Sequence, residues 1–186
     1  MKNIFKLMGL ALIAGSMMFV ACNNDENDNN NTNNPTPEPA SVINVQFGET
    51  TWSPAQVEGE LYADDDYLDI ALYADTNDAT KPMCSGELGL TVMTYDDTVC
   101  SFGYAMNQSD FVPYGQYMYY GWVTNTAFDG SLTVSAIDLN KKTISATGTY
   151  QLMSFSDYLQ YVQQQMAADD VRTAMLNLTF ENAKWE

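Results

Sequence analysis

The chain has 186 residues, of which 46% are hydrophobic and only 17% charged, so it can build the core of one ordinary domain. Its 24 acidic residues outnumber seven basic ones, the formal net charge is −17, and histidine is absent. This charge balance argues against nucleic-acid binding, and the lack of histidine removes His-ligated metal sites and His-based catalytic triads. The composition therefore predicts a non-catalytic protein without a cofactor, with a carboxylate-based glycoside hydrolase as an alternative.

The first 21 residues have the features of a secretion signal. Lys2 and Lys6 precede an apolar run that is shorter than the ~20 residues a membrane-spanning helix needs. The motif Phe19-Val20-Ala21-Cys22 resembles the lipobox of bacterial lipoproteins, with Phe19 in place of the usual leucine. The resemblance implies that Cys22 is lipidated and becomes the first residue of the mature chain. A cysteine within an ordinary cleaved signal peptide is the alternative.

Residues 22–40 are predicted to form a disordered tether, because they are rich in asparagine and end in a segment containing Pro35 and Pro37. The acidic residues soon after Cys22 resemble the export signal that sends lipoproteins of the Bacteroidota to the outer face of the outer membrane. This resemblance implies surface exposure, with a periplasmic orientation as the alternative. The strongly acidic body disfavours anionic lipid surfaces, so the lipid anchor is expected to be the only membrane contact.

From residue 41 to 186 the sequence predicts a single β-rich domain, because short runs alternate between apolar and polar residues. Leu68, Ile70 and Leu72, for example, alternate with polar or tyrosine residues. Further strands are expected at 57–62, 88–95, 99–106, 117–123, 132–139, 143–153 and 176–180. Tight turns between them indicate an antiparallel all-β meander with one short helix, folded as a sandwich or a partly closed, lipocalin-like barrel.

The one helix is predicted over residues 157–168. Ser154 and Asp157 form a helix-start signal of the type S-x-x-D. An apolar stripe with spacings of four, three and four residues follows: Phe155, Leu159, Val162 and Met166. We expect this stripe to cover an open end or an edge of the sheet. The segments 142–150 and 178–185 look like the closing strands of small lipoproteins of the Bacteroidota, a resemblance that implies a β-meander and no activity.

After processing and lipidation of Cys22, the free cysteines are Cys84 and Cys100, and an exported protein can form disulfides. If Asp96 and Asp97 form a two-residue hairpin turn, Cys84 faces Ser109 and the two sulfurs lie far apart on opposite faces. The alternatives are therefore a disulfide, which needs a different turn, and two buried free thiols. No Cys-x-x-Cys motif indicates redox catalysis.

The segment 111–122 has an excess of aromatic residues, six in twelve positions against 12% of the whole chain. In a strand over 117–123 both faces would carry aromatic rings, and at most one face can belong to the core. The other face is expected to contact a glycan or a partner protein. The candidate ligand contacts are Tyr117, Tyr119, Tyr120 and Trp122. An aromatic core covered by a loop is the alternative.

Two acidic clusters lie in predicted turns, one at 64–66 with Asp69 and one at 75–78. They stand at opposite ends of one strand and lack the calcium-loop motif, so we expect solvated turns and no metal site, with weak calcium binding as the alternative. The tripeptide Asp97-Thr98-Val99 is similar to the O-glycosylation signal of exported Bacteroidota proteins. The resemblance implies a sugar on Thr98, with an unmodified hairpin turn as the alternative.

These observations together predict a lipid-anchored, non-enzymatic β-domain at the cell surface that binds a glycan or a partner protein. The alternative function is that of a structural or assembly subunit in an envelope complex. Aromatic excess without catalytic residues motivates the first hypothesis.

Overall fold

The computed structural model describes residues 39–107, 112–114, 117–119, 121–124 and 130–186. Residues 40–186 form one compact unit. Within the described ranges, no helix is long and apolar enough to cross a membrane.

Eleven strands make one antiparallel sheet. They are β1 (Val42–Phe47), β2 (Thr50–Trp52), β3 (Gln56–Tyr62), β4 (Tyr67–Tyr73), β5 (Met83–Gly89), β6 (Thr94–Asp96), β7 (Phe102–Ala105), β10 (Trp122–Thr124), β11 (Gly130–Asp138), β12 (Thr143–Ser154) and β13 (Thr173–Lys184). Two further strands, β8 (Val112–Tyr114) and β9 (Tyr117–Tyr119), form a separate hairpin. A helix, α1 (Phe155–Val162), and a single 3-10 turn, η2 (Ala168–Asp170), lie between β12 and β13.

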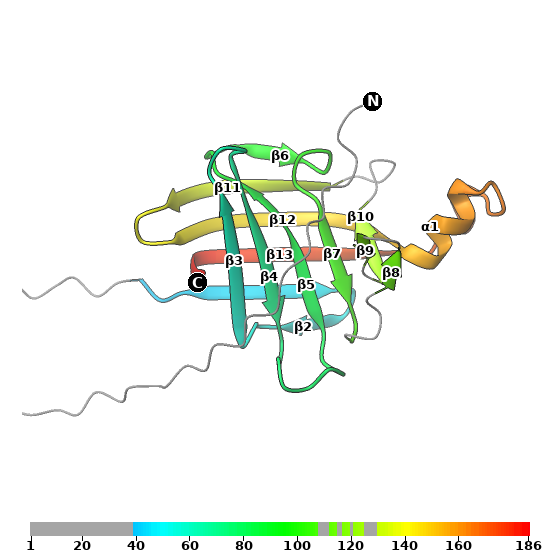
Figure 1. Ribbon diagram of the computed structural model, residues 1–186, viewed down its shortest axis with the longest axis horizontal. Coiled ribbons are helices and arrows are strands. Elements are labelled where there is room, and N and C mark those ends of the chain that lie inside the picture. Colours follow the sequence, from blue (N-terminus) through cyan, green and yellow to red (C-terminus); the bar gives the residue numbers. More distant parts are fainter. Residues whose placement is uncertain (1–38, 108–111, 115–116, 120, 125–129) are drawn as a thin grey trace, which may run out of the picture. The chain divides into compact units, whose positions relative to one another are not determined.

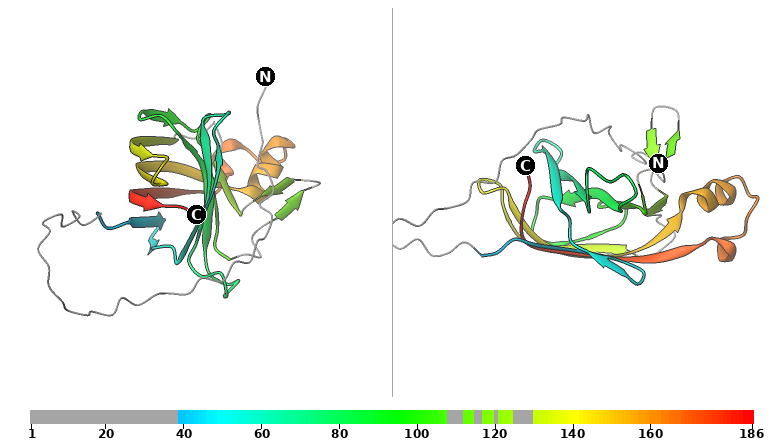
Figure 2. Two further views of the ribbon diagram at one scale, coloured as in Figure 1. Left: turned by 60° about the vertical axis from the view of Figure 1, so that its left-hand side comes forward. Right: turned by 90° about the horizontal axis from the view of Figure 1, so that it is seen from below.

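The sheet curls into a half-barrel of two layers because β12 shares one edge between two partners. Its residues from Thr143 to Tyr150 pair with β11, and its last three, Leu152–Ser154, pair with β10. Strand β10 also pairs with β7, which leads on to β5, β4 and β3. In Figure 1 the strands β3, β4, β5 and β7 run across β1, β13, β12 and β11, and Figure 2 shows the two layers facing each other. The prediction of an antiparallel all-β fold with one short helix is confirmed.

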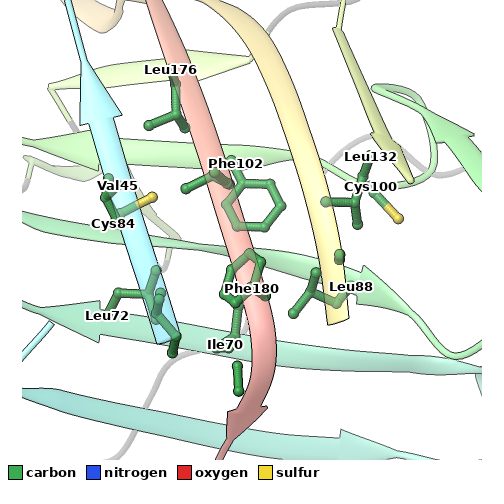
Figure 3. Packing of buried hydrophobic residues seen from close by; sticks show 14 of the residues in the cluster. Val45, Ile70, Leu72, Cys84, Leu88, Cys100, Phe102, Leu132, Leu176 and Phe180 are labelled. Atoms are coloured by element: carbon green, nitrogen blue, oxygen red, sulfur yellow. The ribbon is translucent and has the colours of Figure 1, made fainter. Parts of the chain in front are cut away.

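The core lies between the two layers, as the alternating pattern requires. Val45, Leu132 and Leu178 point inward from the layer that contains β12 and have at most 1% of their surface exposed. Leu68 and Leu72 point inward from β4 in the other layer and are fully buried. All five belong to one hydrophobic cluster, in which Figure 3 shows Val45, Leu72 and Leu132. The predicted inward face of 68–72 is confirmed.

Trp185 packs against the edge strand β3 and connects it to the other layer. A Cβ atom at Gly59 would lie 2.5 Å from Cδ1 of Trp185, so only glycine leaves room for the indole. The backbone N–H of Gly59 donates to the carbonyl oxygen of Glu186 at 3.2 Å. Trp185 is consequently buried, with 4% of its surface exposed.

The hairpin expected around Asp96 and Asp97 is wrong. Strand β5 ends at Gly89, and the following residues cross to the other layer, where β6 pairs with β11. The Tyr95 ring packs over Gly89, where a Cβ atom would lie 2.1 Å from Cζ. The Tyr95 hydroxyl also bonds the backbone N–H and carbonyl of Thr91, each at 2.9 Å. These contacts hold the crossing segment in a conformation that a two-residue turn does not provide.

The helix differs from its prediction both in its residue bounds and in its position relative to the sheet. It begins two residues earlier, directly after β12, and ends before Gln164, whose φ of 57° is left-handed. The apolar stripe is only partly buried, because Val162 is 49% exposed. In Figure 1, α1 extends beyond the end of the sheet, so it does not cover an open end as expected.

The contact between Gly59 and Trp185 gives a direct test of the closed edge. Gly59→Ala forces the added methyl group into a rigid indole, so we expect the free energy of unfolding to fall by about 1–3 kcal/mol. Urea unfolding followed by tryptophan fluorescence measures this loss. Gly48→Asn is the control, because no atom lies within 4 Å of a Cβ there and asparagine tolerates the φ of 56°. Equal stability of Gly59→Ala and the parent would contradict the contact.

Candidate functional site

Three carboxylates form a row across the outer face of β3, β4 and β5. The strand register places Glu60 opposite Asp69, and Asp69 opposite Glu87. Side chains alternate along a strand, and the neighbours Leu68 and Ile70 point into the core, so the row faces outward. Neighbouring strands are about 4.8 Å apart, which brings like charges close together. In Figure 1 this face is turned to the reader, and no labelled element lies over it.

Partial burial and mutual repulsion make these carboxylates hard to ionise. Desolvation and the charge of Glu60 raise the pKa of Asp69 to about 6. Desolvation and the charge of Asp69 raise the pKa of Glu87 to about 7. The two described ion pairs, Lys81 with Asp78 and Arg172 with Asp157, lie elsewhere. Asp69 and Glu87 therefore titrate closer to neutral pH than isolated carboxylates do.

Two tyrosines lie on one side of the carboxylate row. Tyr62 and Tyr67 are register partners, and their rings stack with centroids 4.8 Å apart at an interplanar angle of 16°. Partial burial and a hydrogen bond with Glu60 raise the pKa of Tyr62 to about 12. We name these five residues, Glu60, Tyr62, Tyr67, Asp69 and Glu87, the tyrosine–carboxylate face. It offers flat rings beside groups that can donate and accept hydrogen bonds.

Local sequence patterns did not reveal this face. Asp69 was grouped with the acidic turn at 64–66, although a turn centred between residues 64 and 65 already places Glu60 opposite Asp69. The third carboxylate, Glu87, joins the row only through the pairing of β5 with β4. Local alternation was therefore a usable signal for two of the three groups.

The structure divides the predicted aromatic strand 117–123 into two elements, so that prediction is wrong. Tyr117 and Tyr119 lie in β9, where the register pairs Tyr117 with Tyr114 and Tyr119 with Val112. Tyr120 lies outside the described residues. A role of Tyr117 and Tyr119 in ligand binding stays a prediction.

Trp122 belongs to the main sheet and not to the hairpin of β8 and β9. It opens β10 and is half-buried at the margin of the core. Its ring lies edge-on to Phe47, with centroids 5.2 Å apart. Phe47 also stacks on Tyr104 at 4.0 Å. Core packing therefore accounts for the position of Trp122, and its contact with a ligand stays a prediction.

Cys84 and Cys100 are both free and buried. Of the two predicted alternatives, the structure therefore has the buried free thiols and not the disulfide. Cys84 pairs with Tyr104, four residues beyond Cys100, so their Cα atoms are about 13 Å apart along the sheet. A disulfide needs less than about 7 Å. In Figure 3 the two cysteines lie on either side of Phe102. Burial raises the pKa of both thiols, that of Cys100 to about 11, so neither forms a reactive thiolate.

Thr98 is exposed in the turn that follows β6. Its N–H donates to the Asp96 carboxylate at 3.0 Å, and its hydroxyl donates to the same oxygen. These bonds hold the pKa of Asp96 below its usual value. Glycosylation of Thr98 stays a prediction.

The acidic residues at 75–78 cap their own turn. Asp75 accepts a bond from the N–H of Asn77 at 2.8 Å, and Asp78 accepts one from the N–H of Thr80 at 3.0 Å. Across the described ranges, no group of three or more cysteine or acidic side chains is placed to hold a metal ion.

The predicted helix-start signal forms a different contact from the one expected. Ser154 makes no side-chain capping bond to the helix. Asp157 instead accepts bonds from Nε, Nη2 and the backbone N–H of Arg172 at 2.7, 2.9 and 3.0 Å. These bonds lower the pKa of Asp157 to about 2 and tie the start of α1 to the residues just before β13. We name these contacts between Asp157 and Arg172 the Asp157 clamp, because they fix the position of the start of α1.

Comparisons of this chain with protein-family models, curated proteins and solved structures find no match.

The carboxylate row predicts a pH-dependent stability. Asp69 and Glu87 bind protons more tightly in the folded state than in the unfolded state, where their pKa values are near 4. The free energy of unfolding should therefore fall as the pH rises from about 5 to 8, by an amount on the order of 1 kcal/mol, because solvent screens half-exposed groups. Urea unfolding at each pH measures the slope.

Glu87→Gln should flatten this slope, because it removes one of the repelling charges. Glu181→Gln is the matched control, since it removes an exposed charge from β13 in the other layer. Equal slopes for the two variants would contradict the coupling within the row.

Proposed function

We propose that the protein is a lipid-anchored, non-catalytic carbohydrate-binding protein of the cell envelope, presented at the outer-membrane surface. The lipobox around Cys22 and the acidic, asparagine-rich segment after it support the anchor and the location. The observation that carries the binding function is the stacked pair of Tyr62 and Tyr67 beside the carboxylate row.

The chemistry of this face suits a sugar. The apolar side of a sugar ring packs on a tyrosine ring, and its hydroxyls bond to carboxyl groups. Carboxyls with pKa values near neutrality, such as those of Asp69 and Glu87, both donate and accept hydrogen bonds. Strands hold all five residues, so little conformational entropy is lost on binding. The net charge of −17 disfavours anionic partners, including nucleic acids and anionic lipids.

The arrangement supports binding and not glycoside hydrolysis. A hydrolase places two carboxyl groups on either side of the bond that it breaks. Glu60, Asp69 and Glu87 lie in one row on one face of a sheet, so all three approach a ligand from the same side. This geometry provides contacts to a sugar but no opposed acid and base.

Removal of Tyr67 tests the binding face. We expect Tyr67→Ala to weaken glycan binding about fivefold, because a single aromatic contact contributes on the order of 1 kcal/mol. A glycan array identifies the ligand, and isothermal titration calorimetry measures its affinity. Tyr161→Ala is the matched control, because it removes a half-buried tyrosine from α1, which extends beyond the end of the sheet in Figure 1. Unchanged affinity in a folded Tyr67→Ala variant would contradict the face as the site.

Substitution of Cys22 tests the anchor. Cys22→Ser should lack the mass of the acyl chains and should move from the membrane fraction to the soluble fraction, because acyl burial is the expected membrane contact. Mass spectrometry and fractionation measure both effects, with Asn23→Ser as the neighbouring control. Biotinylation of intact cells tests surface exposure. A Cys22→Ser variant that stays in the membrane fraction would contradict lipid anchoring.

An assembly subunit of an envelope complex is the second candidate function, and α1 favours it. The helix extends from the sheet with a partly exposed apolar stripe that includes Val162 and the half-buried Leu159. A stoichiometric partner that co-purifies in detergent after mild crosslinking would support this function. A monodisperse monomer would argue against it.

A further inference from the structure

The outer face of the other layer carries two rows of small polar residues in register. The rows run across β6, β11, β12, β13 and β1, and the second reaches β2. The first row is Thr94, Thr133, Thr147, Thr179 and Asn44. The second row is Asp96, Ser131, Thr149, Asn177, Gln46 and Thr51. We name these eleven residues the threonine array.

The buried residues between the two rows show that the array side chains face outward. Leu132, Gly148, Leu178 and Val45 occupy the intervening register positions and are buried in the core. Strand residues alternate, so the flanking positions face outward. All members of the array are exposed or half-exposed.

The array is almost free of charge, although the chain carries a net charge of −17. Ten of its eleven residues are neutral, whereas about a quarter to a third of a soluble surface is normally charged. The exception, Asp96, lies at the corner, and its carboxylate is already bonded by the N–H of Thr98 at 3.0 Å. A neutral partner can therefore approach this face without burying an unpaired carboxylate.

Hydrogen bonds between neighbours hold several array side chains in place. The hydroxyls of Thr94 and Thr133 are 2.9 Å apart, and the hydroxyl of Thr149 donates to Asn177 at 3.1 Å. The amide of Asn177 reaches Gln46 at 3.5 Å. Threonine is also stiff because it is branched at Cβ. The array is thus pre-organised, which lowers the entropic cost of binding.

We propose that the threonine array binds a neutral polysaccharide chain. Its hydroxyls and amides both donate and accept hydrogen bonds, as the hydroxyls of sugars do. Strands about 4.8 Å apart repeat these groups at a regular spacing, which suits a ligand that is itself a repeat. Acidic polysaccharides are repelled by the charge of the whole chain. The inference rests on the proposed function in that it takes the ligand to be a carbohydrate, but it uses the opposite layer.

The test is affinity electrophoresis of the full chain in native gels that contain dextran, glucomannan or xyloglucan, with polygalacturonate as the acidic comparison. We expect at least one neutral polysaccharide to retard the chain and polygalacturonate not to. Thr147 is central, because it pairs with both Thr133 and Thr179. Thr147→Val keeps the shape and the strand preference but removes a hydroxyl, and should weaken retardation about threefold. Thr147→Lys lays a long charged side chain over the rows and should abolish it.

The matched controls are Thr91→Val and Thr91→Lys, because Thr91 is exposed and lies outside the array. Thermal unfolding checks that every variant is folded. Unchanged retardation of Thr147→Lys, or retardation by polygalacturonate alone, would overturn the inference.

The same set of proteins separates this inference from the proposed function. If Thr147→Lys binds normally and Tyr67→Ala does not, the array inference fails and the proposed function stands. The array inference also fails, and the proposed function stands, if none of the three neutral polysaccharides retards the unmodified chain but the chain binds oligosaccharides on a glycan microarray. If it binds no carbohydrate in either experiment, both fail.

Discussion

The long strand β12 divides one of its edges between β11 and β10, and the rest of the fold follows from this shared edge. Backbone hydrogen bonds continue through β10 into β7, so the second layer is an extension of the first and not an independent sheet. The turn in the sheet brings Leu178 and Val45 over Leu68 and Leu72 and excludes water from the space between them. The contact of Trp185 with Gly59 then closes the far edge.

Folding one sheet into two layers leaves two outer faces with opposite chemistry. One layer carries adjacent carboxylates whose repulsion works against strand pairing. The other carries hydroxyls and amides whose cross-strand contacts support it. We propose that ligand binding, and not folding, accounts for a surface that costs stability while tyrosines stack beside it. The buried cysteines and the Asp157 clamp, by contrast, are explained by packing and by the position of α1.

Local sequence patterns predicted those parts of the structure that depend on neighbouring residues. Alternation at Leu68, Ile70 and Leu72 was sufficient for the inward face of β4. The same pattern gave a wrong prediction between residues 90 and 101, because β6 pairs with β11 and not with the strands next to it in sequence. The packing of Tyr95 over Gly89 decides that departure, and such a contact has no signature in a local pattern. Because the predicted register was wrong, Cys84 was expected to face Ser109, whereas it pairs with Tyr104.

The same limit applies to the candidate sites. Aromatic composition drew attention to 111–122, but it could not show that Tyr117 and Tyr119 belong to β9 while Trp122 opens β10 in the main sheet. The sequence did not single out the residues of the threonine array, and it placed Asp96 in a turn. Their two rows exist because six strands align, and two of these, β1 and β13, are separated by more than a hundred residues in sequence. Surfaces built by long-range register can be recognised only when that register is known.

The continuity of the sheet through β10 is tested most directly by native-state hydrogen exchange measured by NMR. The amides of Trp122 and Thr124 should be protected to nearly the same degree as those of β12, because they lie within one hydrogen-bonded sheet. Exchange of both amides at the rate of an unstructured peptide, with β12 and β13 still protected, would contradict a single sheet folded into two layers.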